Sequence, residues 1–131
     1  MSARKSYLNT VQFARLEHAC SVVADGLGHC PYLVGSSTER PDFRDVDLRV
    51  ILPDDEFDHL FTKPVVGGFP GGLWGLLCLS VGQYLSDMTG LPIDFQIQRM
   101  TEANEKFKQA DGHARNPMGH GHRLYAGSGD A

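Results

Sequence analysis

Three aspartates lie in two segments whose side chains alternate between polar and apolar residues. Asp45 and Asp47 are two residues apart in segment 45–52, and Asp94 belongs to segment 93–98. Residues i and i+2 of a β-strand point to the same side, so Asp45 and Asp47 can bind one cation together. Mg²⁺ prefers carboxylate and phosphate oxygens, and a third carboxylate on a neighbouring strand permits a second ion about 4 Å away. The sequence therefore predicts a site for Mg²⁺ or Mn²⁺, with two ions expected and Asp45, Asp47 and Asp94 as the metal ligands.

The absence of a cation would leave these carboxylates to repel one another. Like charges at short distance disfavour ionisation, so we expect the pKa of a clustered aspartate to rise. A bound cation is the natural partner for such a cluster.

A second candidate element is the loop after the apolar segment Tyr32–Val34. Gly35 lets the backbone approach a ligand closely, and Ser36-Ser37-Thr38-Glu39 has the Ser-x-x-Glu form of a capping box. This form predicts a short helical turn that ends before Pro41, with its free N–H groups facing a phosphate. Gly35, Ser36 and Ser37 are therefore the candidates for binding a phosphate group.

Arg49 is a further candidate nucleotide-binding residue, because it shares a strand face with Asp45 and Asp47. One interpretation is that its guanidinium contacts a phosphate or the acceptor. The other is that it pairs with a carboxylate, and the sequence does not choose between the two.

The elements that position these residues follow from hydrophobic periodicity. Spacings of three and four predict helices, and spacings of two predict strands. In chain order we expect a helix over 10–28 with Thr10 as its N-cap, strands over 32–34 and 45–52, a short helix ending at 60 or 61, a helix over 73–88, a strand over 93–98 and a short helix over 101–109 capped by Thr101. The pattern predicts an α/β fold in one domain of residues 1–131, with its core over about 10–109 and a partly flexible tail over 110–131.

The ordered set of motifs resembles the polymerase-beta-like (minimal) nucleotidyltransferase superfamily. The resemblance is carried by Val34-Gly35-Ser36, Asp45-Val46-Asp47-Leu48 and Ile93-Asp94-Phe95, and covers residues 10–98. The spacer over 37–44 is slightly short for the family. The resemblance implies a small mixed β-sheet with helices packed mainly on one face. It also implies transfer of an NMP group from an NTP to an acceptor hydroxyl, with release of pyrophosphate.

The same resemblance implies a role for each candidate residue. Gly35 and Ser36 would hold the triphosphate, and Asp45 and Asp47 would bind metal. Asp94 would bind the catalytic metal and accept the proton of the acceptor hydroxyl.

Composition limits the partners. Twelve basic and sixteen acidic residues give a net charge of −4, which excludes a domain-wide basic field for gripping nucleic acid. The chain has no run of about twenty apolar residues, so no membrane span is expected. The basic start Met1–Lys5 is not followed by the apolar run of a signal peptide. Three scattered cysteines form no disulfide framework, so we expect a cytoplasmic location.

The length of the chain leaves little room for an acceptor-binding domain. The acceptor is therefore a small molecule, a protein or an RNA end, held by this domain or presented by a partner protein or a second copy. The alternative function is a catalytically silent nucleotide-binding or protein-interaction module of the same fold, such as a toxin–antitoxin-type partner.

Two segments stay without an assigned role. The Gly-rich segment 64–72 is interpreted as a flexible connection, with a substrate lid as the alternative. The tail contains His113, Arg115, His120, His122 and Arg123 and could fold over the nucleotide, and 115–119 is interpreted as an ordered turn.

Overall fold

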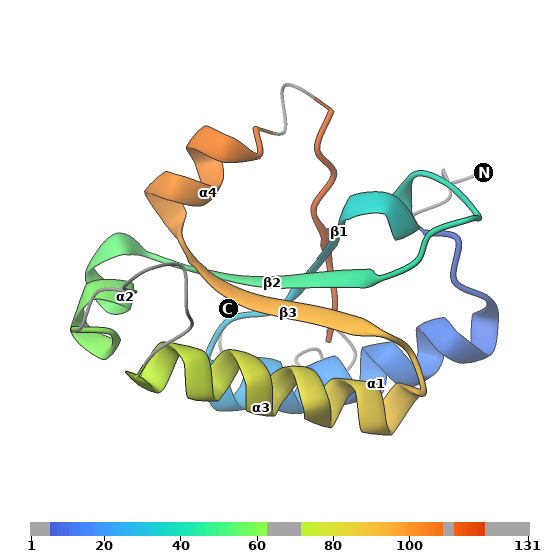
Figure 1. The fold of residues 1–131 in the computed structure, drawn as a ribbon, viewed down its shortest axis with the longest axis horizontal. Helices are drawn as coiled ribbons and strands as arrows, with labels where there is room; N and C mark the ends of the chain where they lie inside the picture. Colours follow the sequence, from blue (N-terminus) through green and yellow to red (C-terminus); the bar gives the residue numbers. More distant parts are fainter. Residues whose placement is uncertain (1–5, 63–71, 109–111, 120–131) are drawn as a thin grey trace, which may run out of the picture.

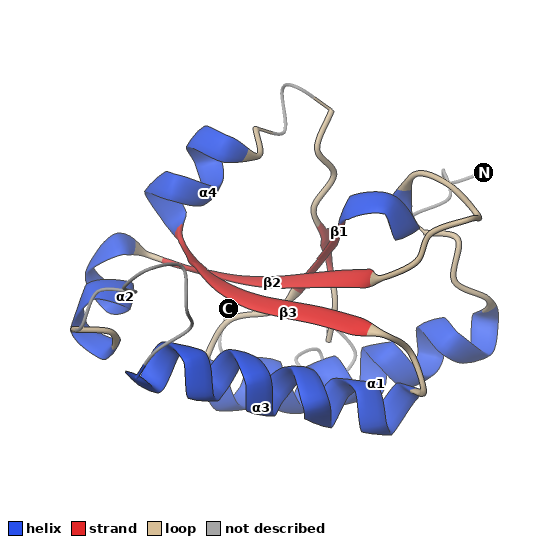
Figure 2. Cartoon of the chain, in the orientation of Figure 1, coloured by secondary structure: helices blue, strands red, loops and turns tan. Residues whose placement is uncertain are grey.

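The structure is a computed structural model that describes residues 6–62, 72–108 and 112–119. Its elements in chain order are α1 (Thr10–Leu27), β1 (Tyr32–Val34), the 3-10 helix η1 (Gly35–Thr38), β2 (Val46–Leu52), α2 (Asp54–Leu60), α3 (Gly72–Thr89), β3 (Ile93–Arg99), α4 (Met100–Lys106) and β4 (Asn116–Pro117). Figure 1 shows the path of the chain, and Figure 2 separates helices from strands. The predicted α/β class is confirmed. Residues 64–71 of the predicted Gly-rich connection 64–72 lie outside the described ranges. The tail residues His120, His122 and Arg123 also lie outside them.

The four strands form one mixed sheet in the order β3-β2-β1-β4. Strands β2 and β3 are parallel, whereas β1 is antiparallel to both β2 and β4. The two long helices, α1 and α3, lie side by side on one face of the sheet, and α4 and η1 rise on the other side (Figure 1). The small mixed sheet with its main helices on one face agrees with the expectation.

The core lies between the sheet and the pair α1 and α3. Alternate residues of β2 are fully buried toward these helices, and they meet Leu16 of α1 and Leu85 of α3. These residues of β2 are Val46, Leu48, Val50 and Leu52. Because strand side chains alternate, Asp47, Arg49 and Ile51 point to the opposite face of the sheet. Polar groups are therefore positioned on the face that the long helices leave open.

Two helix starts differ from the predictions. Asn9, rather than Thr10, is the N-cap of α1, because its side chain accepts a hydrogen bond from the N–H of Gln12 at 2.8 Å, and the Gln12 side chain accepts one from the N–H of Asn9. Arg99 stands at the N-cap position of α4, so Thr101 is not its cap. The N–H of Thr101 donates instead to the carboxylate of Asp54, which connects α4 to the start of α2.

The fourth strand was not predicted. Asn116–Pro117 pairs with β1, and the N–H of Met118 donates to the carbonyl of Pro31 at 2.8 Å. The Met118 side chain is fully buried in the core. The segment 115–119, which was interpreted as a turn, therefore contains strand β4 at Asn116–Pro117. Within the described ranges, no helix is both long and apolar enough to cross a membrane.

Candidate active site

Two of the three predicted aspartates are brought together by the parallel strands. Asp47 of β2 and Asp94 of β3 are direct partners in the strand register. Paired positions on adjacent strands point to the same face and lie about 5 Å apart. Both carboxylates therefore lie on the open face of the sheet, as the alternation in the sequence predicts.

Asp45 occupies a different position from the one expected. It lies in the bend directly before β2 and is exposed. The strand begins at Val46, whose N–H donates to the carbonyl of Pro92 at 2.8 Å. The predicted strand start at residue 45 is therefore wrong by one residue, although the charge of Asp45 still influences Asp47.

Gly35 and Asp47 are in close contact. Gly35 has φ +75°, and a Cβ atom at this position would overlap Asp47 Oδ2 and lie 3.1 Å from Asp47 Cγ. Glycine is thus required both by the left-handed backbone and by the carboxylate packed against it. The Gly-Ser turn and the first carboxylate form one unit.

The predicted short turn is present as η1, which ends at Thr38, before Pro41. The predicted capping box does not form. The carbonyl of Ser36 accepts hydrogen bonds from the N–H groups of Glu39 and Arg40, each at 3.0 Å, and Thr38 Oγ1 donates to the carbonyl of Gly35 at 2.7 Å. A four-residue 3-10 turn closes through its own backbone, because i to i+3 bonds use the groups that a cap would satisfy.

The two serines of the turn point in different directions. Ser36 lines a cavity beside Asp47. The side chain of Ser37 is fully buried, its Oγ has no hydrogen-bond partner among the described residues, and its carbonyl accepts from the N–H of Tyr7 at 2.7 Å. The structure therefore separates the Ser37 side chain from the other candidate residues.

Arg49 connects the two carboxylates. Its Nη1 donates to the carbonyls of Asp94 at 2.7 Å and Leu48 at 2.9 Å. Its Nη2 lies 3.4 Å from Asp94 Oδ2 and 4.0 Å from Asp47 Oδ1. The carboxylate-pairing interpretation of Arg49 is confirmed, and its contact with a phosphate stays a prediction.

The pKa of Asp47 is raised above its usual value. Burial is the largest cause, and the charges of Asp94 and Asp45 add to it, while the charge of Arg49 opposes the rise. The rise expected for clustered carboxylates is confirmed in direction, with desolvation as the main cause. A further positive charge beside Asp47 would stabilise its ionised form.

The predicted metal ligands are brought together only in part. Among the described residues, no group of three or more Asp, Glu, His or Cys side chains is placed to hold a metal ion. The chemistry of the donors fits a hard cation, because Asp47 and Asp94 offer carboxylate oxygens on one face and Asp47 is partly desolvated. The guanidinium of Arg49 now supplies the compensating charge. Asp47 and Asp94 are therefore the residues that fit a metal best.

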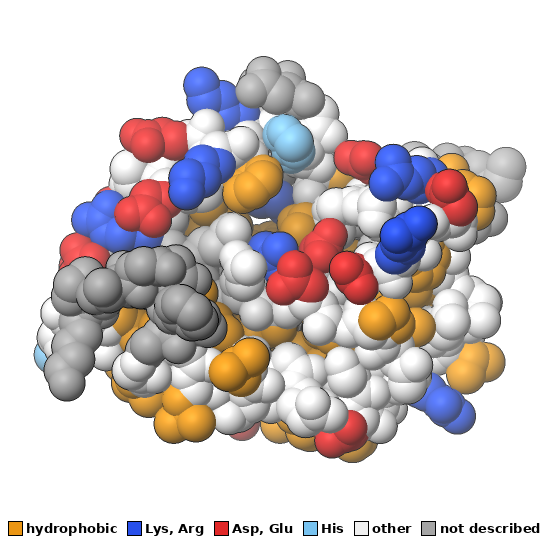
Figure 3. All heavy atoms as spheres, in the orientation of Figure 1, with side chains coloured by type: hydrophobic (Ala, Val, Ile, Leu, Met, Phe, Trp, Pro, Cys, Tyr) orange, Lys and Arg blue, Asp and Glu red, His pale blue; other side chains and the backbone are white. Residues whose placement is uncertain are grey.

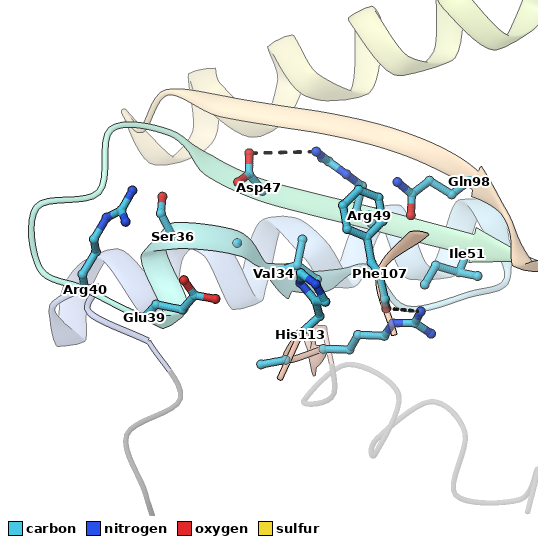
Figure 4. Close-up of a pocket in the computed structure, with 13 residues that line it drawn as sticks. Val34, Ser36, Glu39, Arg40, Asp47, Arg49, Ile51, Gln98, Phe107 and His113 are labelled. Carbon is cyan, nitrogen blue, oxygen red and sulfur yellow. Dashed lines mark hydrogen bonds and ion pairs between the residues drawn. The ribbon is translucent and has the colours of Figure 1, made fainter. Parts of the chain in front are cut away.

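A cavity of about 360 Å³ lies beside this unit on the open face (Figure 4). Its lining includes Gly35, Ser36, Asp47 and Arg49 together with Phe107, which directly follows α4, and residues 113–115. Figure 3 shows a hollow in this face, with acidic and basic side chains gathered beside it.

The far wall of this cavity contains His113 of the tail and Phe107, which was not among the residues predicted for the site. Their ring centroids are 5.7 Å apart in an edge-on arrangement. Arg115, expected to reach a phosphate if the tail folds over the nucleotide, binds Asn104 Oδ1 and the carbonyls of Ala103 and Phe107 at 2.9–3.2 Å. The signal available in the sequence was a single aromatic residue, Phe107, among the polar residues of segment 101–109, whose predicted helix ends earlier, at Lys106.

The order of the elements and the pairing of Asp47 with Asp94 agree with the motifs identified in the sequence. No family model matches the chain, and comparisons with curated proteins and with solved structures give no significant match.

Proposed function

We propose that this protein is a metal-dependent nucleotidyltransferase that moves an NMP group from an NTP to an acceptor hydroxyl. The observation that carries the proposal is the direct pairing of Asp47 with Asp94 beside the Gly35 turn, next to a cavity of about 360 Å³. This volume lies within the usual range for small-molecule sites. The nucleotidyltransferase arrangement of the fold is part of the same proposal.

Each residue has a role in the proposed reaction. Gly35 and Ser36 hold the triphosphate at the turn, and Asp94 accepts the proton of the attacking hydroxyl. One or two Mg²⁺ or Mn²⁺ ions held by Asp47 and Asp94, with Asp45 nearby, would neutralise phosphate charge and lower the pKa of the hydroxyl. The acceptor oxygen forms a bond to the α-phosphorus, the bond from that phosphorus to the bridging oxygen breaks, and pyrophosphate leaves with the electron pair.

Arg49 is the residue whose partners change in this proposal. Its guanidinium lies between two carboxylates that a cation would neutralise, and it is only 14% exposed. Once the cation is bound, the charge of Arg49 becomes free for a phosphate oxygen, which guanidinium binds well.

The setting of the reaction is also proposed. The acceptor is a small molecule, a protein or an RNA end, held by this domain or presented by a partner protein or a second copy of the chain. Cys20, Cys30 and Cys78 are free thiols, and Cys20 and Cys78 are buried, which suits the reducing cytoplasm.

The proposal is tested by calorimetric titration with each NTP, in Mg²⁺ and again in EDTA. We expect the wild type to bind at least one NTP in Mg²⁺ and to lose that binding in EDTA. Asp47→Asn removes a ligand charge and should weaken metal-dependent binding by at least about tenfold, whereas Asp55→Asn, on exposed helix α2, should leave it unchanged. No binding of any NTP–Mg²⁺ complex at millimolar concentration would overturn the proposal.

A second candidate, the catalytically silent module, is favoured by one observation. Arg49 already compensates Asp47 and Asp94 without a cation, as expected for a site that no longer turns over. Stoichiometric NTP binding without pyrophosphate release over a broad acceptor panel, together with a stable heteromeric complex, would support this candidate over the enzyme.

A further inference from the structure

The cavity beside Asp47 has two chemically different ends. Figure 4 shows Ser36 and Arg40 at one end and Phe107, Gln98 and Ile51 at the other. The first end offers the backbone of the Gly35 turn and the Arg40 guanidinium to an anion, with the Glu39 carboxylate beside them. The second end offers an aromatic ring, an aliphatic side chain and an amide.

Phe107 gives the second end an exposed aromatic surface. The Phe107 side chain is 46% exposed, although the burial of a phenyl ring away from water is favourable. Its backbone is fixed on both sides, because its N–H donates to the carbonyl of Ala103 at 2.9 Å and its carbonyl accepts from Arg115 Nη2 at 3.1 Å. The backbone that carries the ring is therefore fixed beside the cavity, and the ring itself contacts the ring of His113 edge-on.

Gln98 gives the same end a group that can read a planar ligand. It lies on β3 on the same face as Asp94, and it is the register partner of Ile51. Its amide carries both donors and an acceptor, and it makes no side-chain hydrogen bond to another described residue. An amide free in a cavity wall is ready to pair with the edge of a ligand.

We infer that this end of the cavity is a nucleobase subsite, in which the base stacks against Phe107 and its polar edge pairs with Gln98. The inference rests on the proposed function and names the residues that contact the base. The ribose separates base from phosphates, so a nucleotide with its phosphates at Gly35 and Ser36 extends along β2 toward Ile51. A nucleobase supplies both the flat face and the donor–acceptor edge that these side chains complement.

The test separates the base from the phosphates, using the full chain and calorimetry in Mg²⁺. Two probes are titrated, the best-bound NTP and inorganic tripolyphosphate. Phe107→Ala should weaken NTP binding by about tenfold and leave tripolyphosphate binding unchanged, because only the base stacks. Phe107→Tyr keeps the aromatic face and should restore wild-type affinity.

Two further variants complete the design. Met100→Ala removes an exposed apolar side chain at the start of α4 that does not line the cavity, and it should leave the binding of both probes unaffected. Gln98→Leu should reduce the affinity ratio between the best-bound and the other NTPs toward one, with tripolyphosphate binding retained.

The outcomes distinguish the two proposals. NTP affinity equal to wild type in Phe107→Ala would overturn the nucleobase subsite alone. Equal losses for NTP and tripolyphosphate would also overturn it, because the change would then lie in the fold or the phosphate site. A wild type that binds no NTP would overturn the proposed function and this inference with it.

Discussion

Gly35 and Asp47 illustrate how the site is built from single residues. The carboxylate of Asp47 occupies the volume that any side chain at position 35 would need. The Gly-Ser and Asp-x-Asp motifs were separate signals in the sequence, and their contact explains why a glycine precedes the serine. Such a motif can be recognised from residue types that lie close together in the sequence. The contact between its two parts depends instead on the pairing of β1 with β2.

A Gly35→Ala substitution tests this contact. Gly90 has nearly the same φ, +73°, but an added Cβ there meets no atom within 4 Å, so Gly90→Ala is a matched control. Both variants place an alanine in the left-handed backbone region, which lowers the free energy of unfolding by about 1–2 kcal/mol. Gly35→Ala must also displace the Asp47 carboxylate. We expect urea unfolding to show the larger loss of stability for Gly35→Ala. Equal losses in the two variants would contradict the contact.

The raised pKa of Asp47 predicts a dependence of stability on pH. Because the folded state disfavours the charged carboxyl, the fold is relatively less stable once pH rises through the folded pKa, which lies above the usual 3.8. Asp47→Asn removes that charge, so it should increase the free energy of unfolding at pH 7. The gain should shrink toward pH 3, where the wild-type carboxyl is protonated. Urea unfolding at both pH values measures the difference, and a loss of stability at pH 7 would show that the ion pair with Arg49 outweighs burial.

At the scale of elements, helix α3 does more than cover the sheet. It runs along the outer edge of β3, where Trp74 Nε1 donates to the carbonyl of Ile97 at 2.8 Å and the N–H of Ile93 lies 3.3 Å from Ser86 Oγ. Such contacts occupy backbone groups that an edge strand otherwise leaves open to other chains. The hydrophobic spacing of the sequence correctly predicted a helix over most of α3. The hydrogen bonds of Trp74 and Ser86 were not predictable, because they depend on which strand lies at the edge.

The successes and failures of the sequence analysis have one physical reason. Strands β2 and β3 were predicted to within one residue, because alternation over seven residues is a local signal. Strand β4 was missed, because two residues that include Pro117 carry no alternation and are fixed by distant partners. The cap at Thr101 failed for the same reason, since Asp54 of another helix binds its N–H.

At the scale of the whole molecule, the cavity depends on segments far apart in the chain. Strands β1 and β2 form its floor, whereas Phe107 and residues 113–115 form a wall. That wall is fixed at its end by Met118 and Gly119, and a Cβ on Gly119 would lie 2.9 Å from the carbonyl oxygen of Cys20 in α1.

The net charge of −4 includes the charges of Asp47 and Asp94, which the proposed cation would neutralise. The value of −4 therefore overstates the negative charge that the proposed nucleotide would meet.

A Met118→Ala substitution tests whether the last described strand holds the molecule together. The side chain is fully buried, and truncation of a core methionine to alanine costs about 2–5 kcal/mol. Met100→Ala makes the same chemical change at a residue that is 38% exposed and should cost about 0.5 kcal/mol or less. Urea unfolding measures the loss of stability in each variant.

Because the wall of the cavity ends at Met118, Met118→Ala should also bind NTP more weakly at a temperature where it is still folded. Its affinity for tripolyphosphate should be affected less. Equal stability of the two variants would mean that the segment over 112–119 contributes little to the fold.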